Sequence, residues 1–210
     1  MSQDSQDFIK QELVHISRLF YERGWSLATS GNYSARIDKN RVLITTSGLD
    51  KGSMNESDTV MVDLQGLLID ELKPDLRPSA ETILHCELYR FDPAIKAVLH
   101  THSIYSTVIS MQASRESHIT LGGYEMLKAL RGVSTHEHHE AIPIFPNSQN
   151  MKFLSQLAVE YLKANPDTHA FLIVGHGLYT WGRKIQEAKR HVEALEFLLE
   201  CEYRKLMIRE

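Results

Sequence analysis

The sequence predicts an α/β fold, a three-layer α/β/α sandwich whose central sheet is mainly antiparallel. Helical patterns and short apolar strand patterns alternate along all 210 residues, as expected for a sheet covered by helices. No glycine-rich dinucleotide or phosphate-loop motif follows any of the strand patterns. The chain also contains no internal repeat and no low-complexity segment, so we expect one domain spanning residues 1–210.

The N-terminal part of the chain is predicted to contain two helices and three short strands. Apolar residues near a helical period predict a helix from about Phe8 to Arg23, and Gly24 ends it. Strands are expected over residues 32–37, 41–45 and 59–63. Ser79 has a side chain suited to a helix N-cap and predicts a helix over residues 79–89.

The rest of the chain continues the alternation of strands and helices. Strands are expected over residues 94–101, 141–145, 170–174 and 178–181. Helices are expected over residues 104–111, 124–131, 153–164 and 185–207. The last helix is the longest, because its apolar residues stay on one helical face from Ile185 to Leu206.

Charge and composition exclude several classes of protein. The formal net charge of −4 provides no basic surface for a nucleic acid. No apolar run approaches the ~20 residues of a membrane span, and the polar segment Met1–Ser5 lacks the pattern of a signal peptide. Cys86 and Cys201 lie in helical patterns and are expected to be reduced thiols. We therefore expect a cytoplasmic protein with neither a nucleic acid nor a membrane as its partner.

Three histidines have the placement of a metal site. His100 and His102 end an apolar strand pattern, and side chains at i and i+2 of a strand point to one face. His176 lies between two glycines near the end of another strand, where the backbone can make an unusual turn. Three imidazoles with an open fourth position are typical of catalytic zinc. The alternative is that these histidines are ordinary core or surface residues.

The other histidines are less informative. The run His136-Glu137-His138-His139 looks metal-like but lies in a polar stretch without an apolar wall, so we interpret it as a solvated loop. His85 follows Glu81 by one helical turn and is expected to pair with that carboxylate. Four more histidines belong to no pattern and are interpreted as structural: His15, His118, His169 and His191.

Two short segments combine glycine with small polar residues, at 29–32 and 45–48. Exposed backbone N–H groups at glycine, with hydroxyls nearby, can form a cradle for an anion. Ser79, at the start of a predicted helix, would add the positive end of a helix dipole. The alternative is ordinary turn chemistry, which composition alone favours.

Five motifs in this order resemble the class II aldolase/adducin family. They are Ser30-Gly31-Asn32, Thr46-Ser47-Gly48, Pro78-Ser79-Ala80-Glu81, His100-Thr101-His102-Ser103 and Gly175-His176-Gly177. The resemblance implies an α/β/α fold and a homotetramer with active sites between subunits. It also implies one zinc ion per subunit on His100, His102 and His176. A substrate phosphate is implied to lie among Gly31, Asn32, Ser47, Gly48 and Ser79.

Within the family, three further segments resemble a branch of hydro-lyases that acts in methionine salvage. They are Gly123–Lys128, Pro143–Asn147 and Gly177–Gly182. The implied reaction is the zinc-dependent dehydration of a 5-methylthio ketopentose 1-phosphate to its 2,3-diketone. One residue departs from the branch, because Thr82 stands where its animal members have a substrate-contacting cysteine.

Two glutamates are candidates for the catalytic acid and base. In the aldolases of the family the residue matching Glu81 has this role, and in the dehydrating branch it passes to the residue matching Glu125. The resemblance therefore implies Glu125 as the catalytic group, with Glu81 as the second candidate. Without the resemblance, Glu125 would be interpreted as an ordinary acid in the first turn of a helix. Two other functions stay open: a sugar-phosphate aldolase or 4-epimerase, and a non-catalytic interaction module like the adducin head.

Overall fold

The computed structural model describes residues 3–70 and 75–208. Its α-helices are α1 (Gln3–Glu22), α2 (Thr82–Phe91), α3 (Ile104–Gln112), α4 (Met151–Ala164) and α5 (Ile185–Ile208). Its strands are β1 (Asn32–Arg36), β2 (Arg41–Thr45), β3 (Thr59–Asp63), β4 (Ala97–Thr101), β5 (His118–Gly122), β6 (His139–Phe145), β7 (Ala170–Ile173) and β8 (Gly177–Gly182). Short 3₁₀ helices are η1 (Glu56–Asp58), η2 (Ala113–Arg115) and η3 (Glu125–Ala129).

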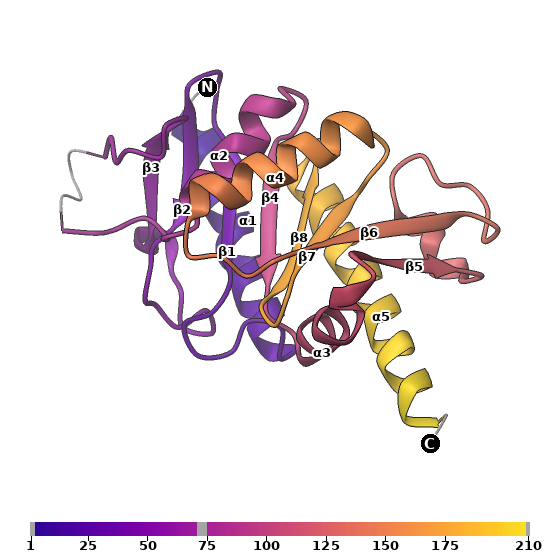
Figure 1. Ribbon diagram of the computed structural model, residues 1–210. Helices are drawn as coiled ribbons and strands as arrows, with labels where there is room; N and C mark the ends of the chain where they lie inside the picture. Colours follow the sequence, from indigo (N-terminus) through magenta and orange to yellow (C-terminus); the bar gives the residue numbers. More distant parts are fainter. Residues whose placement is uncertain (1–2, 71–74, 209–210) are drawn as a thin grey trace.

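The eight strands form one sheet in the order β3-β2-β1-β4-β8-β7-β6-β5. Neighbouring strands are antiparallel except β6 and β7, which are parallel. Helices cover both faces, and β5 and β6 form the end of the sheet opposite β3, on the right of Figure 1. The predicted sandwich with a mainly antiparallel sheet is therefore confirmed.

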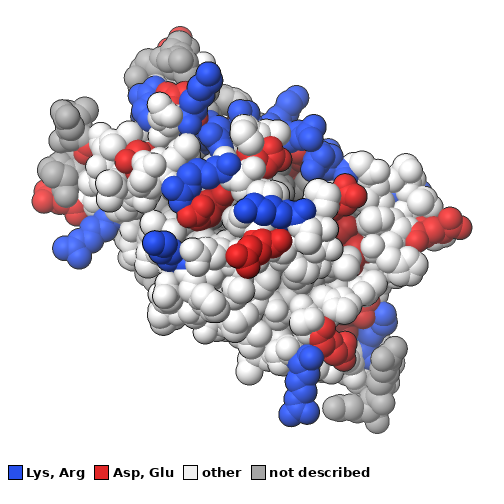
Figure 2. All heavy atoms as spheres, turned by 45° about the horizontal axis from the view of Figure 1, so that its top comes forward, with Lys and Arg blue, Asp and Glu red and all other residues white. Residues whose placement is uncertain are grey.

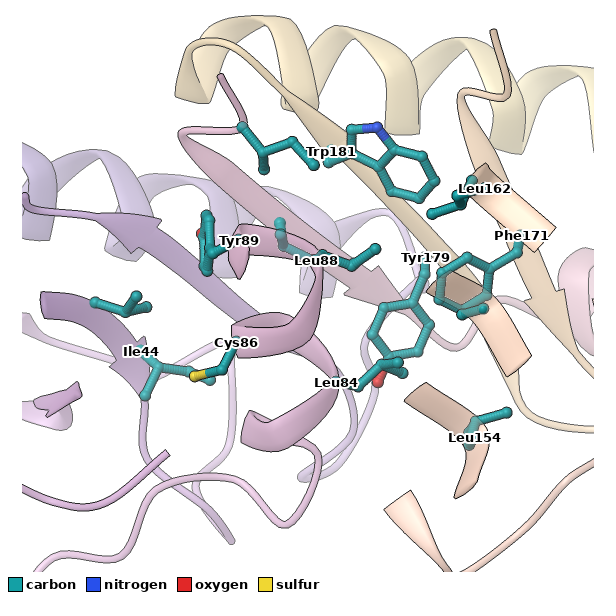
Figure 3. Close-up of a cluster of buried hydrophobic side chains, with 14 of the residues drawn as sticks. Ile44, Leu84, Cys86, Leu88, Tyr89, Leu154, Leu162, Phe171, Tyr179 and Trp181 are labelled. Atoms are coloured by element: carbon teal, nitrogen blue, oxygen red, sulfur yellow. The ribbon is translucent and has the colours of Figure 1, made fainter. Parts of the chain in front are cut away.

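The apolar core lies on both faces of the sheet. On one face, α2 and α4 pack against the strands, and Figure 3 shows Leu84 and Leu88 of α2 near Tyr179 and Trp181 of β8. On the other face, α1, α3 and α5 enclose two further clusters of buried side chains. Each helix buries one apolar stripe against the sheet, as expected for amphipathic helices in a layered fold.

Alternation along the central strand β4 decides where its histidines point. Ala97 and Leu99 belong to the core beneath α1 and α5, whereas Val98 belongs to the core beneath α2 and α4. Because side chains two residues apart share a face, His100 points to the same side as Val98. The first histidine of the predicted metal site therefore lies on the side of α2.

Local differences between the predictions and the structure lie at α2, η3 and β5. Helix α2 begins at Thr82 with Glu81 as its N-cap, and the Ser79 hydroxyl instead accepts a hydrogen bond from the Glu81 backbone N–H at 3.3 Å. The expected helix over 124–131 is the shorter η3, because it lies between Gly123 and Gly132, both at positive φ. Strand β5 was not predicted, because only Leu121 of this edge strand is buried and the strand lacks an apolar run.

The surface has charged side chains of both signs (Figure 2). Figure 2 shows acidic and basic side chains interspersed on one face. Across residues 3–70 and 75–208, no helix combines the length and apolarity that crossing a bilayer requires. Both cysteines are free thiols.

Candidate metal and phosphate site

The three predicted histidines meet at one end of the central strands. Strands β4 and β8 are antiparallel with Thr101 opposite Leu178, so the turn before β8 carries His176 to the end of β4. The ring centroid of His102 lies 4.4 Å from that of His100 and 4.5 Å from that of His176. The spacing argument from the sequence therefore identified three side chains that are neighbours in the fold.

Gly177 makes this meeting possible. A Cβ atom at this position would lie 1.9 Å from the carbonyl oxygen of Thr101, far inside van der Waals contact. Only glycine lets the turn that bears His176 approach β4 so closely.

Glu81 is the fourth member of the cluster. Its Oε1 lies 3.1 Å from His176 Nε2, and its Oε2 lies 3.3 Å from His100 Nε2. One ligand atom from each of Glu81, His100, His102 and His176 lies within 4.8 Å of the other three. Within the described part of the chain, no other set of three metal-binding side chains converges in this way.

The protonation of the cluster suits a cation. His100 donates its Nδ1–H to the carbonyl oxygen of Leu178 at 2.9 Å, which leaves the Nε2 lone pair directed at the cluster. Burial lowers the pKa of His100 to about 4. Burial and the neighbouring imidazoles lower the pKa of His102 to about 2. Both rings are therefore neutral near pH 7, as metal ligands must be.

Glu81 supplies negative charge to these neutral rings. Burial alone would raise its pKa, but His100, His176 and a hydrogen bond from Asn32 outweigh burial and hold the pKa well below its usual range. The cluster therefore offers imidazole nitrogens and an ionised carboxylate, a donor set that fits a divalent transition metal.

The predicted phosphate loops line the same cavity as this cluster. The cavity has a volume of about 280 Å³. The predicted phosphate residues on its wall are Gly31, Asn32, Ser47, Gly48 and Ser79. Glu81, His102 and His176 line it as well, whereas His100 is fully buried behind them. A ligand in this cavity would contact the polar loops and the histidine cluster together.

Three further residues of the cavity wall were not predicted: Lys51, Gln149 and Met151. Lys51 is only 1% exposed, and its Nζ donates to the carbonyl oxygens of Leu49 at 2.9 Å and Thr29 at 3.4 Å. Burial lowers its pKa. A lysine three residues after Gly48 was the available signal, but the sequence does not show that its side chain turns inward.

Glu125 does not reach the cavity within one chain. Its side chain is 71% exposed on η3, where it forms an ion pair with Lys128 at 2.6 Å and has Oε1 at 3.3 Å from Nδ1 of His136. The second histidine run is also divided, because His138 binds Glu140 at 2.8 Å instead of converging with His136. The run was expected to be a solvated loop, but its last residue, His139, begins strand β6.

His85 was expected to pair with the carboxylate of Glu81, and this prediction was wrong. The His85 ring is fully buried, and its Nε2 binds Oδ1 of Asn32 at 2.5 Å rather than the carboxylate of Glu81. Burial lowers the pKa of His85 to about 4. The sequence could not show this contact, because it depends on how α2 packs against β1.

Comparison with known proteins agrees with this geometry. The family model described as the Class II Aldolase and Adducin N-terminal domain matches residues 11–203. The chain belongs to the class II aldolase and adducin family. A family member from Pseudomonas paraeruginosa (strain DSM 24068 / PA7), named methylthioribulose-1-phosphate dehydratase, is 46% identical over 205 residues, 98% of each chain. One of the same name from Hahella chejuensis (strain KCTC 2396) is 47% identical over 199 residues, covering 95% of this chain and 94% of that protein.

Solved structures of class II aldolase relatives share the fold. YgbL from Escherichia coli, described as a putative aldolase/epimerase/decarboxylase, has a TM-score of 0.79 and 26% identity, covering 95% of this chain and 90% of that chain. The L-fuculose-1-phosphate aldolase from Thermus thermophilus has a TM-score of 0.76 and covers 97% of this chain and 99% of that chain. At 22% identity, the second likeness supports the fold alone.

Proposed function

We propose that this chain is a hydro-lyase that dehydrates 5-methylthioribulose 1-phosphate to 5-methylthio-2,3-diketopentyl 1-phosphate in methionine salvage. The observation that carries the proposal is that a metal-competent cluster and two glycine-containing polar loops line one cavity. Similarity over 98% of the chain to a protein named methylthioribulose-1-phosphate dehydratase supports the choice of substrate.

The proposed metal is zinc, one ion per subunit, held by His100, His102 and His176. Three imidazoles suit zinc, although Fe, Co, Ni and Mn also accept them. When bound, the ion supplies Lewis-acid polarisation of the substrate's carbonyl and hydroxyl oxygens. Glu81, which faces the same cluster, is proposed to position the hydroxyls of the substrate.

The proposed phosphate subsite is the part of the cavity wall that offers hydrogen-bond donors. Gly31 and Gly48 both have positive φ, a conformation that lets backbone N–H groups form an anion cradle. Ser47 and Ser79 add hydroxyls, and Lys51 adds a buried positive charge. A dianionic phosphate bound there would hold the sugar carbons beside the histidines.

Proton transfer is assigned to Glu125 of a neighbouring subunit. The exposure of Glu125 on η3 supports this assignment. Its side chain does not reach the cavity of its own chain, but a second copy of the chain can approach it. The carboxylate takes the proton from C3 and returns it to the C4 hydroxyl, which leaves as water. The enol that remains tautomerises to the diketone, and the carboxylate is regenerated. A homotetramer with active sites between subunits is part of this proposal.

We also propose the cytoplasm as the compartment, since both cysteines are free thiols. The family match over residues 11–203 supports a single domain. The complete histidine set argues against a non-catalytic adducin-like module, which would have no need to keep it.

A second candidate is a sugar-phosphate aldolase or 4-epimerase, which the position of Glu81 in the cluster favours. The two functions break different bonds, C4–O in the dehydratase and C3–C4 in the aldolase. Purified chain would be incubated with 5-methylthioribulose 1-phosphate and with a panel of ketose phosphates, each with and without a chelator. A chelator-sensitive diketone product supports the dehydratase. A triose phosphate from any ketose 1-phosphate would make the aldolase the better assignment.

A further inference from the structure

A buried line of polar side chains runs from Glu81 into the space between β1 and α2. Strand β1 contributes Asn32 and Ser34, which share a face because they are two residues apart. Helix α2 and its N-cap contribute Glu81, His85 and Tyr89, which share a face because they are four residues apart. We call these five residues the β1–α2 seam.

The seam is a continuous chain of hydrogen bonds. Asn32 Nδ2 lies 2.5 Å from Glu81 Oε2, and Asn32 Oδ1 lies 2.5 Å from His85 Nε2. His85 Nδ1 lies 2.7 Å from Ser34 Oγ, which in turn lies 2.8 Å from the Tyr89 hydroxyl. Except for Glu81, which is 9% exposed, all members are at most 5% exposed.

The chemistry of the two ends sets the direction of every bond. The Glu81 carboxylate can only accept, so Asn32 turns its amide N–H to Glu81 and its carbonyl oxygen to His85. His85 must therefore donate from Nε2. A fully buried imidazole that contacts no carboxylate is neutral, so its Nδ1 accepts from Ser34. Tyr89 then donates to Ser34, and the seam ends there.

Asn32 is also held beside the cluster by the sheet. It pairs directly with His100 across the antiparallel strands β1 and β4. Its amide therefore reaches the one carboxylate oxygen, Oε2, that faces His100. The other oxygen, Oε1, is left to face His176.

We propose that His85 is a positioning residue, which through Asn32 holds the Glu81 carboxylate with one oxygen toward His100 and the other toward His176. Without the His85 N–H, Asn32 Oδ1 loses the hydrogen bond that it accepts, and the bond to Glu81 is left to hold the amide in place. A buried polar line is harder to satisfy than an apolar contact between a strand and a helix. The β1–α2 seam lies behind Glu81, so it can position this carboxylate, which an apolar contact at the same place could not do.

Three variants test this role. His85→Leu removes the N–H, whereas His85→Gln keeps a side-chain N–H at the place of Nε2. Cys86→Ala, in the next position of α2, is the control for lost core packing, since Cys86 is fully buried but outside the seam. Outer partners of metal ligands typically contribute about 10–100-fold in metal affinity or activity. We therefore expect about that loss for His85→Leu and less than about threefold for the other two variants.

Two readouts separate positioning from stability. The zinc dissociation constant, measured by competition with a chelator, needs no substrate, and kcat and KM for 5-methylthioribulose 1-phosphate depend on the proposed function. Positioning predicts weaker zinc binding and lower kcat with little change in KM. The wild-type protein should also show a slowly exchanging imidazole Nε2–H proton in its NMR spectrum that His85→Leu lacks.

The inference fails if His85→Leu keeps zinc affinity and kcat, or if His85→Gln loses as much as His85→Leu. It also fails if Cys86→Ala reproduces the loss, because the effect would then be general core damage. A wild-type protein with no dehydratase activity would overturn the proposed function. The zinc and NMR measurements would still decide the role of His85.

Discussion

Glu81 Oε1 lies 3.1 Å from Nε2 of His176, and this contact joins the start of α2 to the turn before β8. Two segments that are remote in sequence therefore contribute side chains to one cluster. Glu81 belongs to the cluster that could hold a metal whichever group moves the substrate proton, whereas Glu125 lies apart from this cluster. Because of this difference, substitutions of the two glutamates should have different effects on metal binding.

Glu125→Gln should abolish most of the dehydration and leave the metal in place. Removal of a general acid or base commonly costs about 10²–10⁴-fold in rate, and the cluster lacks Glu125. Initial rates and metal content would be measured together. Glu81→Gln should instead weaken metal binding as well as activity, because it removes the charge of the cluster. Glu137→Gln, an exposed acid in the neighbouring loop, is the control. Unchanged dehydration by Glu125→Gln with zinc bound would make the assignment of the base wrong.

Mixed oligomers should show whether one site draws on two chains. Glu125→Gln and His102→Ala are each expected to be inactive alone. In a random equal mixture, about a quarter of the sites would combine an intact cluster with an intact Glu125 from a neighbour. Co-expression with two different affinity tags allows the mixed species to be purified and assayed. Recovery of activity only in the mixed species supports inter-subunit sites. Equal inactivity of mixed and unmixed species would assign both residues to one chain.

Much of this site was accessible from the sequence, for physical reasons that particular residues illustrate. His100 and His102 were identifiable because strand periodicity alone puts them on one face, and His176 because flanking glycines mark a tight turn. The polar loops at 29–32 and 45–48 were identifiable because glycine next to small polar residues indicates a local conformation that exposes backbone N–H groups. In each case the information is local to a few residues.

The parts that were missed depend on packing between distant elements. The His85–Asn32 contact requires α2 to lie across β1, and the buried position of Lys51 requires its loop to fold against residue Thr29. Strand β5 was missed because its burial is set by its edge position. The N-cap of α2 is Glu81 and not Ser79, because Thr46 pairs with Pro78 and holds that segment beside the β2 loop.

Lys51→Met should weaken substrate binding more than turnover. Hydrogen bonds to charged groups contribute about 1.5–3 kcal/mol, which corresponds to roughly 10–100-fold in KM. The KM for 5-methylthioribulose 1-phosphate and the dissociation constant of inorganic phosphate would both be measured. Lys39→Met removes an exposed lysine and should change neither value. An unaltered phosphate affinity in Lys51→Met would exclude Lys51 from the phosphate subsite.

Gly177→Ala should damage the metal site and the fold together. The added Cβ would meet the Thr101 carbonyl oxygen, so β4 and β8 must separate where His176 is attached. Overpacking of this kind costs about 1–3 kcal/mol, and loss of zinc is expected with it. Gly132→Ala is the control for backbone strain without steric overlap, because Gly132 has a φ of +82° and nothing lies within 4 Å of the place where a Cβ would be added. Denaturant unfolding and metal analysis would be compared, and similar zinc content in the two variants would contradict the prediction.

Glu196→Gln should make the protein more stable at alkaline pH. Glu196 lies on α5 with only 1% exposure, and Thr101 donates a hydrogen bond to its Oε1 at 2.5 Å. Burial raises the pKa of Glu196 from 4.5 to about 7. A raised carboxyl pKa means that the folded state binds the proton more tightly, so its stabilisation is complete below pH 4.5 and is lost as the pH rises through about 7. The free energy of unfolding would be measured from pH 5 to pH 8 for wild type and variant. The wild type should lose about 2.5 kcal/mol relative to the variant over that range, and parallel pH profiles would show that Glu196 does not titrate in this way.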